Sequence, residues 1–292
     1  MSHEAWMARA IRLAQLGLYT TDPNPRVGCV IVKNGELVAE GWHRKAGEPH
    51  AEKIALAAAG KKAEGATVYV TLEPCCHHGR TPPCSDALIA ARVGRVFVAM
   101  QDPNPLVSGK GLEQLRAAGI DVVTGVLGSE AEKLNPGFIK RMSGGLPYVR
   151  CKLAMSLDGR TAMASGESKW ITSDASRRDV HRLRARSSAI VTGIGTVLAD
   201  DPSMTVRLPA EALDGVEREA DIRQPLRVVL DTHLALSPDA AILKQPGETL
   251  VVTTSDDGAL ADALMATGAT LLRQDHSDEI DLAAVLGHLA ET

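Results

Sequence analysis

The chain has 292 residues, of which 45% are hydrophobic and 23% charged, and its formal net charge at pH 7 is −4. A weakly acidic protein with 3% aromatic residues lacks the basic, base-stacking surface of a nucleic-acid binder, so we expect a small-molecule partner and no nucleic acid. No stretch reaches the roughly 18 apolar residues of a membrane helix, so we expect no membrane partner. The length suffices for two domains, each with its own core.

The five cysteines are an odd number, and the N-terminus alternates charged with apolar residues, unlike the basic-then-apolar plan of a signal peptide. In such a chain the thiols are more often reduced and used for chemistry than paired in disulfides. We therefore expect a cytoplasmic protein.

The first half of the sequence predicts alternating helices and strands. A helix begins close to the N-terminus, and two strands follow within 27–43, joined by Asn34-Gly35, a pair that accepts the positive φ angles of a type I′ hairpin. Further helices are expected at 51–60, 85–93 and 111–119, and further strands at 66–74, 95–100 and 120–126. This alternation is typical of a sheet covered by helices.

A second α/β pattern follows 140–149, a stretch of basic, glycine and proline residues without periodicity. We place the domain boundary there, with one domain over 1–146 and the other over 147–292. The second domain is expected to begin with two strands and an Asp158-Gly159 turn, within 148–164. A helix capped by Ser173 or Asp174 and three buried strands follow, the helix at 173–186 and the strands at 189–194, 226–231 and 249–254.

The residues that carry chemistry lie in "EPHAEKIAL" and "TLEPCCHHGRTPPC". His50 and Glu52 are two residues apart, so they can share a site only where a helix begins. Cys75 follows a predicted strand, and Cys84 precedes a predicted helix whose N-terminus would lower the pKa of its thiol. One imidazole and two thiolates form a zinc site with a fourth position open for water, which indicates catalysis.

Glu52 can then move a proton from that water to a leaving amine, and the reaction would be hydrolytic deamination. The order H-x-E, P-C and a second cysteine is the zinc-deaminase signature, although eight residues separate the cysteines here instead of two. The alternatives are a closed structural site, in which Cys76, His77 or His78 is a fourth ligand, and a polar loop without metal.

The motifs "HAE" and "TLEPCCHHGRTPPC", with "DPNPRVGCVIV" and "QDPNPLVSGKG", closely resemble the deaminase half of the bifunctional riboflavin-biosynthesis deaminase/reductase family. The resemblance implies an N-terminal cytidine-deaminase-like three-layer α/β domain. In it His50, Cys75 and Cys84 would bind zinc, Glu52 would donate the proton, and Asn24 would contact the substrate. From the residues alone, Asn24 could equally be a turn residue between prolines. His43 and Arg80 are further candidates for contacts with the substrate or its phosphate, and each could equally be a solvated loop residue.

The motifs "LAMSLDGRTAMASGESKWITS" and "TGIGTVLADDPSMTVR" resemble the reductase half of the same family, which has the dihydrofolate-reductase fold and uses NADPH. By this resemblance Ala154, Trp170, Thr196 and Asp200 would bind NADPH, and Ser168, Arg184, Met204 and Arg207 would bind the substrate. Plainer interpretations stay open: Trp170 as a core residue, Arg184 on a solvated basic face, and "GIGTVL" as a simple strand-to-helix turn.

Together these features predict a two-domain enzyme of riboflavin biosynthesis, and we expect a homo-oligomer. It would deaminate 2,5-diamino-6-ribosylamino-4(3H)-pyrimidinone 5′-phosphate with zinc, then reduce the ribosyl side chain to ribityl with NADPH. The alternatives are a nucleotide or tRNA deaminase with an appended domain, and a zinc-stabilised module that binds a flavin precursor.

In the family, the reductase half continues past a helix like "DLAAVLGHLAE" into a strand and a glycine-rich loop for the pyrophosphate of the cofactor. The sequence stops at Thr292, before such a loop. We therefore expect a second domain that is incomplete at its C-terminus, binds NADPH weakly and reduces poorly or not at all, beside a normal deaminase.

Overall fold

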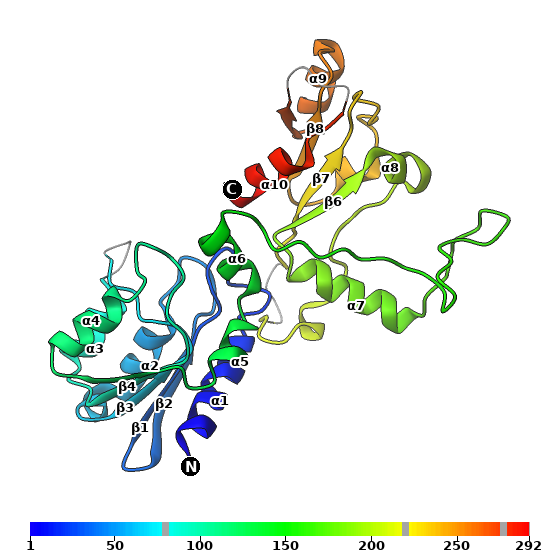
Figure 1. Cartoon of the computed structure of the whole chain (residues 1–292). Helices are drawn as coiled ribbons and strands as arrows, with labels where there is room; N and C mark the ends of the chain where they lie inside the picture. Colours follow the sequence, from blue (N-terminus) through cyan, green and yellow to red (C-terminus); the bar gives the residue numbers. More distant parts are fainter. Residues whose placement is uncertain (78–81, 218–221, 275–278, 292) are drawn as a thin grey trace. The chain divides into compact units, whose positions relative to one another are not determined.

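The computed structural model describes residues 1–77, 82–217, 222–274 and 279–291. The chain divides into two compact units (Figure 1). The first unit comprises Met1–Tyr148 and Asp214–Val216, and the second comprises Val149–Leu213 and Glu217–Thr292.

The first unit contains, within the described residues, a five-stranded sheet in the order β2-β1-β3-β4-β5. Its strands are β1 (Gly28–Lys33), β2 (Glu36–Trp42), β3 (Thr67–Val70), β4 (Arg95–Val98) and β5 (Asp121–Thr124). β1 and β2 form the hairpin predicted from Asn34 and Gly35, both of which have positive φ. β1 also pairs antiparallel with β3, whereas β3, β4 and β5 run parallel because helices connect them.

Helices cover both faces of this sheet. Successive side chains of a strand point to opposite faces, and here both sets are apolar and need a covering layer. Ile31 and Val68 belong to one apolar core, with α2 (Ala51–Ala59), α3 (Cys84–Ala90) and α4 (Lys110–Ala117). Val30 and Tyr69 belong to the other, with α1 (His3–Gln15) and α5 (Gly128–Glu132). The predicted three-layer α/β arrangement is thereby confirmed. A 3-10 turn, η1 (Gly60–Ala63), and helix α6 (Pro136–Gly144) complete the unit.

Two glycines allow helices to lie directly against strand backbone. A Cβ atom at Gly28 would lie 2.0 Å from the carbonyl oxygen of Ala10 in α1, and one at Gly41 would lie 2.8 Å from that of Ala51 in α2. Only glycine permits such an approach. The contact at Gly41 holds the first turn of α2, which carries Glu52, against the sheet.

The second unit contains, within the described residues, a four-stranded parallel sheet in the order β6-β7-β8-β9. Its strands are β6 (Ala189–Gly193), β7 (Leu226–Leu230), β8 (Thr249–Thr253) and β9 (Thr270–Arg273). Its helices are α7 (Asp174–Ala185), α8 (Ile194–Asp200), α9 (Gly258–Met265) and α10 (Leu282–Glu291), with the 3-10 turns η2 (Ala210–Ala212) and η3 (Ala241–Lys244). Val229 packs in a core with α8 and α9, and Val228 in a second core with α10.

The buried strands at 226–231 and 249–254 are confirmed, as is the helix at 173–186, where the Ser173 hydroxyl accepts a hydrogen bond from the amide of Ser176. The strand at 189–194 also forms, but the prediction that it is buried is wrong. β6 lies at the edge of the sheet, and Val191 is 45% exposed.

The predicted pair of strands within 148–164 does not form, since none of these residues, all described, lies in a strand. The turn alone is present, with the amide of Gly159 donating to the carbonyl oxygen of Ser156. The apolar side chains of the segment stay exposed, Leu153 by 66%. An alternating pattern becomes a strand only where a neighbouring strand supplies hydrogen bonds, and the sequence pattern cannot show that neighbour.

Helix α6 also differs from the prediction, because it includes residues 140–144 of the stretch interpreted as lacking periodicity. Pro136 begins this helix at a position where proline is favourable, and Gly145, with φ 66°, ends it. None of the helices in the described part of the chain has the length and apolar character needed to cross a lipid bilayer.

Candidate active site

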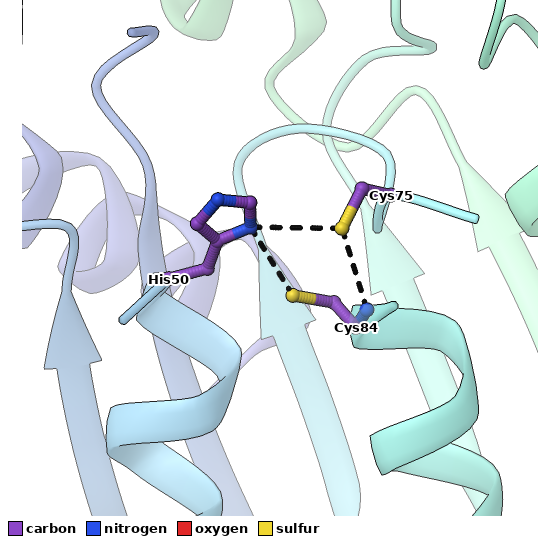
Figure 2. Close-up of side chains that lie close together, drawn as sticks. All are labelled: His50, Cys75 and Cys84. Atoms are coloured by element: carbon purple, nitrogen blue, oxygen red, sulfur yellow. Dashed lines mark hydrogen bonds between the residues drawn. The ribbon is translucent and has the colours of Figure 1, made fainter. Parts of the chain in front are cut away.

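The side chains of His50, Cys75 and Cys84, which are residue types that bind metals, converge at one end of the first sheet (Figure 2). His50 caps the N-terminus of α2, Cys75 lies in the loop after β3, and Cys84 is the first residue of α3. The Nδ1 atom of His50 lies 3.6 Å from the sulfur of Cys75 and 3.4 Å from that of Cys84. In a tetrahedral zinc site the nitrogen and sulfur ligands are about 3.6 Å apart, so the three side chains fit zinc.

The cluster is limited to these three residues within the part of the chain that the structure describes. Its ligand atoms lie within 4.8 Å of one another, and neither Cys76 nor His77 joins them. His78 and Arg80, two other candidates from the sequence, fall outside the described residues. Three protein ligands leave one tetrahedral position for a small molecule, which is typical of catalytic zinc sites.

The two thiols of the cluster hold their protons unequally. A hydrogen bond from the thiol of Cys84 lowers the pKa of Cys75 to about 4, with further contributions from His50 and from the backbone amide of Cys84. That amide lies 3.3 Å from the sulfur of Cys75. The same thiol–thiol bond, burial and Glu52 raise the pKa of Cys84. The backbone amide at the start of α3 thus points at Cys75, and this helix start favours the thiolate of Cys75, whereas the sequence predicts the effect for Cys84.

Glu52 lies in the first turn of α2 and is 3% exposed. Burial raises the pKa of its carboxyl, and the nearby His50 opposes part of this effect. A carboxyl whose charged form is disfavoured exchanges protons closer to neutral pH than an exposed glutamate does. The start of α2 thus places a buried carboxyl beside the cluster of His50, Cys75 and Cys84.

Asn24 and His43 form a hydrogen-bonded pair next to the cluster. The Nδ2 atom of Asn24 lies 3.1 Å from Nε2 of His43, whose Nδ1 lies 3.1 Å from the carbonyl oxygen of Pro49. The ring of His43 is 3% exposed and meets the ring of His50 edge to face, with the centroids 5.4 Å apart. His43 therefore links the candidate substrate contact to the segment that carries the candidate metal ligand.

Glu73 is a buried residue that sequence reasoning does not single out. Its carboxylate accepts hydrogen bonds from the amides of Asp102 at 3.1 Å, Gly109 at 2.9 Å and Gly111 at 2.9 Å. Glu73, which lies two residues before Cys75, thereby fixes the loop "QDPNPLVSGKG". Within this loop, burial raises the pKa of Asp102 to about 6. The available signal is an acidic residue between a buried strand and a proline in "TLEPC".

In the second unit, Arg184 and Arg207 form a basic group with His181. The guanidinium of Arg184 donates to the carbonyl oxygen of Thr205 at 3.0 Å, and the amide of Arg207 donates to Nδ1 of His181 at 3.2 Å. Burial and the charge of Arg207 lower the pKa of Arg184. Arg184 is therefore not simply a member of a solvated basic face. Two positive charges held close together favour the binding of an anion. Met204, with φ 52°, lies in the same loop.

The other candidates of the second unit lie around Trp170 and α8. Trp170 is 71% exposed, so its interpretation as a core residue is wrong, and the guanidinium of Arg177 lies 4.4 Å from the centre of its ring. Its neighbour Lys169, which follows Ser168, lies 4.0 Å from the carboxylate of Asp200 at the end of α8. Thr196 is exposed on the same helix, and Ala154 lies in the irregular segment 148–164.

Comparison with known families divides the chain between two descriptions. Residues 1–100 match the "Cytidine and deoxycytidylate deaminase zinc-binding region", which contains His50, Cys75 and Cys84. Residues 147–292 match the "RibD C-terminal domain".

Curated relatives match nearly the whole chain. The riboflavin biosynthesis protein RibD of Escherichia coli K12 is 56% identical over 293 residues, covering 100% of this chain and 79% of the relative. The protein of the same name from Aquifex aeolicus is 46% identical, covering 91% of this chain and 72% of the relative.

Solved structures agree with these matches. Acinetobacter baumannii RibD, form 1, is 51% identical with a TM-score of 0.88, covering 99% of this chain and 77% of that one. A Thermotoga maritima diaminohydroxyphosphoribosylaminopyrimidine deaminase/5-amino-6-(5-phosphoribosylamino)uracil reductase is 40% identical with a TM-score of 0.84 and the same coverage.

Proposed function

Because the chain belongs to the RibD family of riboflavin biosynthesis proteins, we propose that it is a bifunctional deaminase and reductase. Its substrate would be the diaminopyrimidinone ribosylamino phosphate named above, which loses an amine and is then reduced from the ribosyl to the ribityl form. The observation that carries the proposal is the open cluster of His50, Cys75 and Cys84 with Glu52 buried beside it. Five unpaired cysteines suit a reducing cytoplasm.

For deamination, His50, Cys75 and Cys84 would hold zinc, which when bound activates water for attack on the ring carbon that carries the amine. Glu52 accepts a proton on its carboxylate and delivers it to the departing amine, which leaves as ammonia. Burial raises the pKa of this carboxyl, which suits both roles because it favours the protonated form more than at an exposed glutamate. Asn24 orients the pyrimidine through its amide.

For reduction, Ala154, Trp170, Thr196 and Asp200 would hold NADPH, which when bound supplies the hydride. The exposed indole of Trp170 with the guanidinium of Arg177 above it fits such a dinucleotide, since a flat ring and a positive charge stand together. Ser168 and Met204 would contact the sugar side chain of the substrate, and Arg184 and Arg207 its phosphate.

The two arginines provide a test of the reductase half. Replacing Arg184 or Arg207 by alanine removes a charged hydrogen-bond donor, so the KM for the sugar phosphate is expected to rise roughly 10- to 100-fold in the NADPH oxidation assay. Ammonia release should not change. The matched control is Arg182→Ala, because Arg182 is exposed and lies on α7, the helix that carries Arg184. An equal loss of deamination in the Arg184 and Arg207 variants would show that they serve a shared or structural role.

The function itself is tested by offering the purified protein the diaminopyrimidinone phosphate and recording ammonia release and NADPH oxidation as separate signals. We expect ammonia first and NADPH oxidation only after deamination. A nucleotide or tRNA deaminase would instead release ammonia from cytidine or adenosine substrates, and a binding module would give neither signal with any of them.

A further inference from the structure

We propose that His43 is a positioning residue that fixes the orientation of the Asn24 amide, so that Asn24 presents its carbonyl oxygen to a hydrogen-bond donor of the substrate. The inference rests on the proposed deaminase function and deepens it. It assigns to Asn24 the recognition of an N–H or O–H group, and it makes His43 the residue that sets this preference.

The hydrogen bonds of His43 determine which ring nitrogen carries the proton. The carbonyl oxygen of Pro49, 3.1 Å from Nδ1, can only accept a hydrogen bond, so Nδ1 must donate. A neutral imidazole has one N–H, and Nε2 is therefore an acceptor. The side chain of Asn24 can satisfy Nε2 only through its own N–H group, at the observed distance of 3.1 Å.

The opposite orientation of the Asn24 amide is unfavourable for a physical reason. It would place the carbonyl oxygen of Asn24 against the lone pair of Nε2, unless His43 carried a second proton. A charged imidazolium at a site 3% exposed would lose its hydration, and its two hydrogen-bond partners, an amide and a carbonyl, are uncharged. His43 therefore selects one of two amide orientations that are nearly equal in shape.

The backbone around Asn24 is already fixed, so the amide orientation is what remains to be set. The amide N–H of Asn24 donates to the carbonyl oxygen of Thr21 at 2.7 Å. Two residues later, the backbone amide of Arg26 donates to the side-chain oxygen of the buried Asn135 at 2.8 Å, and the side-chain Nδ2 of Asn135 donates to the carbonyl oxygen of Arg26 at 2.9 Å. These contacts hold the loop from both sides.

The second hydrogen bond of His43, to Pro49, connects the Asn24–His43 pair to the segment that carries His50. Pro49 directly precedes His50, and the rings of His43 and His50 are in edge-to-face contact. One side chain thus contacts both the amide of Asn24 and the ring of His50, a proposed zinc ligand. A substrate edge that offers N–H or O–H groups, such as an aminopyrimidine, would be held in register with the reacting carbon.

Two conservative substitutions separate the two bonds of His43. In His43→Gln the longer side chain reaches the position of Nε2, where its oxygen can accept the N–H of Asn24. In His43→Asn the shorter side chain reaches only the position of Nδ1, so it can keep the bond to Pro49 but not the one to Asn24. We expect kcat/KM for ammonia release to stay within roughly threefold of wild type in His43→Gln and to fall roughly 10- to 100-fold in His43→Asn.

A double-mutant cycle with Asn24→Ala then tests whether His43 acts through Asn24. In that background His43→Asn should cost no further activity, because the amide to be oriented is gone. Zinc content and NADPH oxidation with the deaminated pyrimidine phosphate should match wild type in every variant. Additive losses, loss of zinc in His43→Asn, or equal losses in the Gln and Asn variants would each overturn the inference.

Calorimetric titration of the same variants with the diaminopyrimidinone phosphate, in the Glu52→Gln background that prevents turnover, measures binding apart from the chemical step. If wild type released no ammonia, the proposed function would fail. The inference would still hold if the affinity for that ligand fell in His43→Asn, recovered in His43→Gln and showed no further loss in the double variant. It would be overturned if the two His43 variants bound the ligand equally.

Discussion

Replacing Glu52 by glutamine is expected to abolish ammonia release while zinc binding stays at the wild-type level. Glutamine has the size and shape of glutamate but cannot carry a proton on its side chain, so the attacking water keeps its proton and the amine is not protonated as it leaves. Loss of a general acid–base group typically lowers the rate by a factor of about 10²–10⁴. The measurement is steady-state ammonia release beside metal analysis of the same samples.

The matched control is Glu64→Gln, which makes the same chemical change at an exposed carboxylate. Glu64 follows α2 and η1 in the chain and forms an ion pair with Arg92. It should leave both ammonia release and zinc unchanged. If Glu52→Gln lost its zinc, Glu52 would be a ligand or a structural support. Retention of full activity would show that the proton moves through another group.

The first unit could be predicted closely because its sheet is buried on both faces. When both faces are buried, the apolar residues of each strand fix its pairing register, because a shift by one residue would turn every side chain to the opposite face. The positive φ angles of Asn34 and Gly35 fix the position of the hairpin turn. The spacing of His50 and Glu52 required a helix start, which α2 supplies. The cytidine-deaminase-like and reductase domains and the riboflavin family predicted from the motifs are confirmed by the family matches and the relatives.

Features that depend on distant partners could not be predicted from local patterns. The segment 148–164 has the alternation of strands, but its hydrogen bonds depend on a neighbour that no local pattern identifies. Likewise, the sequence places Cys84 at a helix start but does not show that its amide points at Cys75. Glu73 bonds to amides 29 and 38 residues later in the chain, so its role becomes visible only in the fold.

His43 illustrates the same limit inside the site. The sequence indicates a candidate contact with the substrate, whereas the structure bonds both of its ring nitrogens to the protein. A motif identifies the residue type that chemistry needs, but hydrogen-bond partners decide whether that residue meets the substrate or orients a neighbour that does.

Replacing Cys84 by serine is expected to remove zinc from the protein and, with it, the deaminase activity. A serine hydroxyl does not ionise near neutral pH, so the site would keep one imidazole and one thiolate, too few ligands for a zinc site. Wild type should hold about one zinc per chain after dialysis against a weak chelator, and the variant less than about a tenth of that. NADPH oxidation with the deaminated pyrimidine should persist, because the cluster lies in the first unit.

The matched control is Cys76→Ser, the same substitution at the cysteine next to Cys75. Burial raises the pKa of Cys76, and its thiol is not part of the cluster within the described residues. This variant should therefore keep both zinc and ammonia release. Loss of zinc in Cys76→Ser would identify a fourth protein ligand, and a closed site of that kind leaves no position for the water that deamination requires. Full zinc in Cys84→Ser would instead place the metal elsewhere, and the argument from the geometry of His50, Cys75 and Cys84 would fail with it.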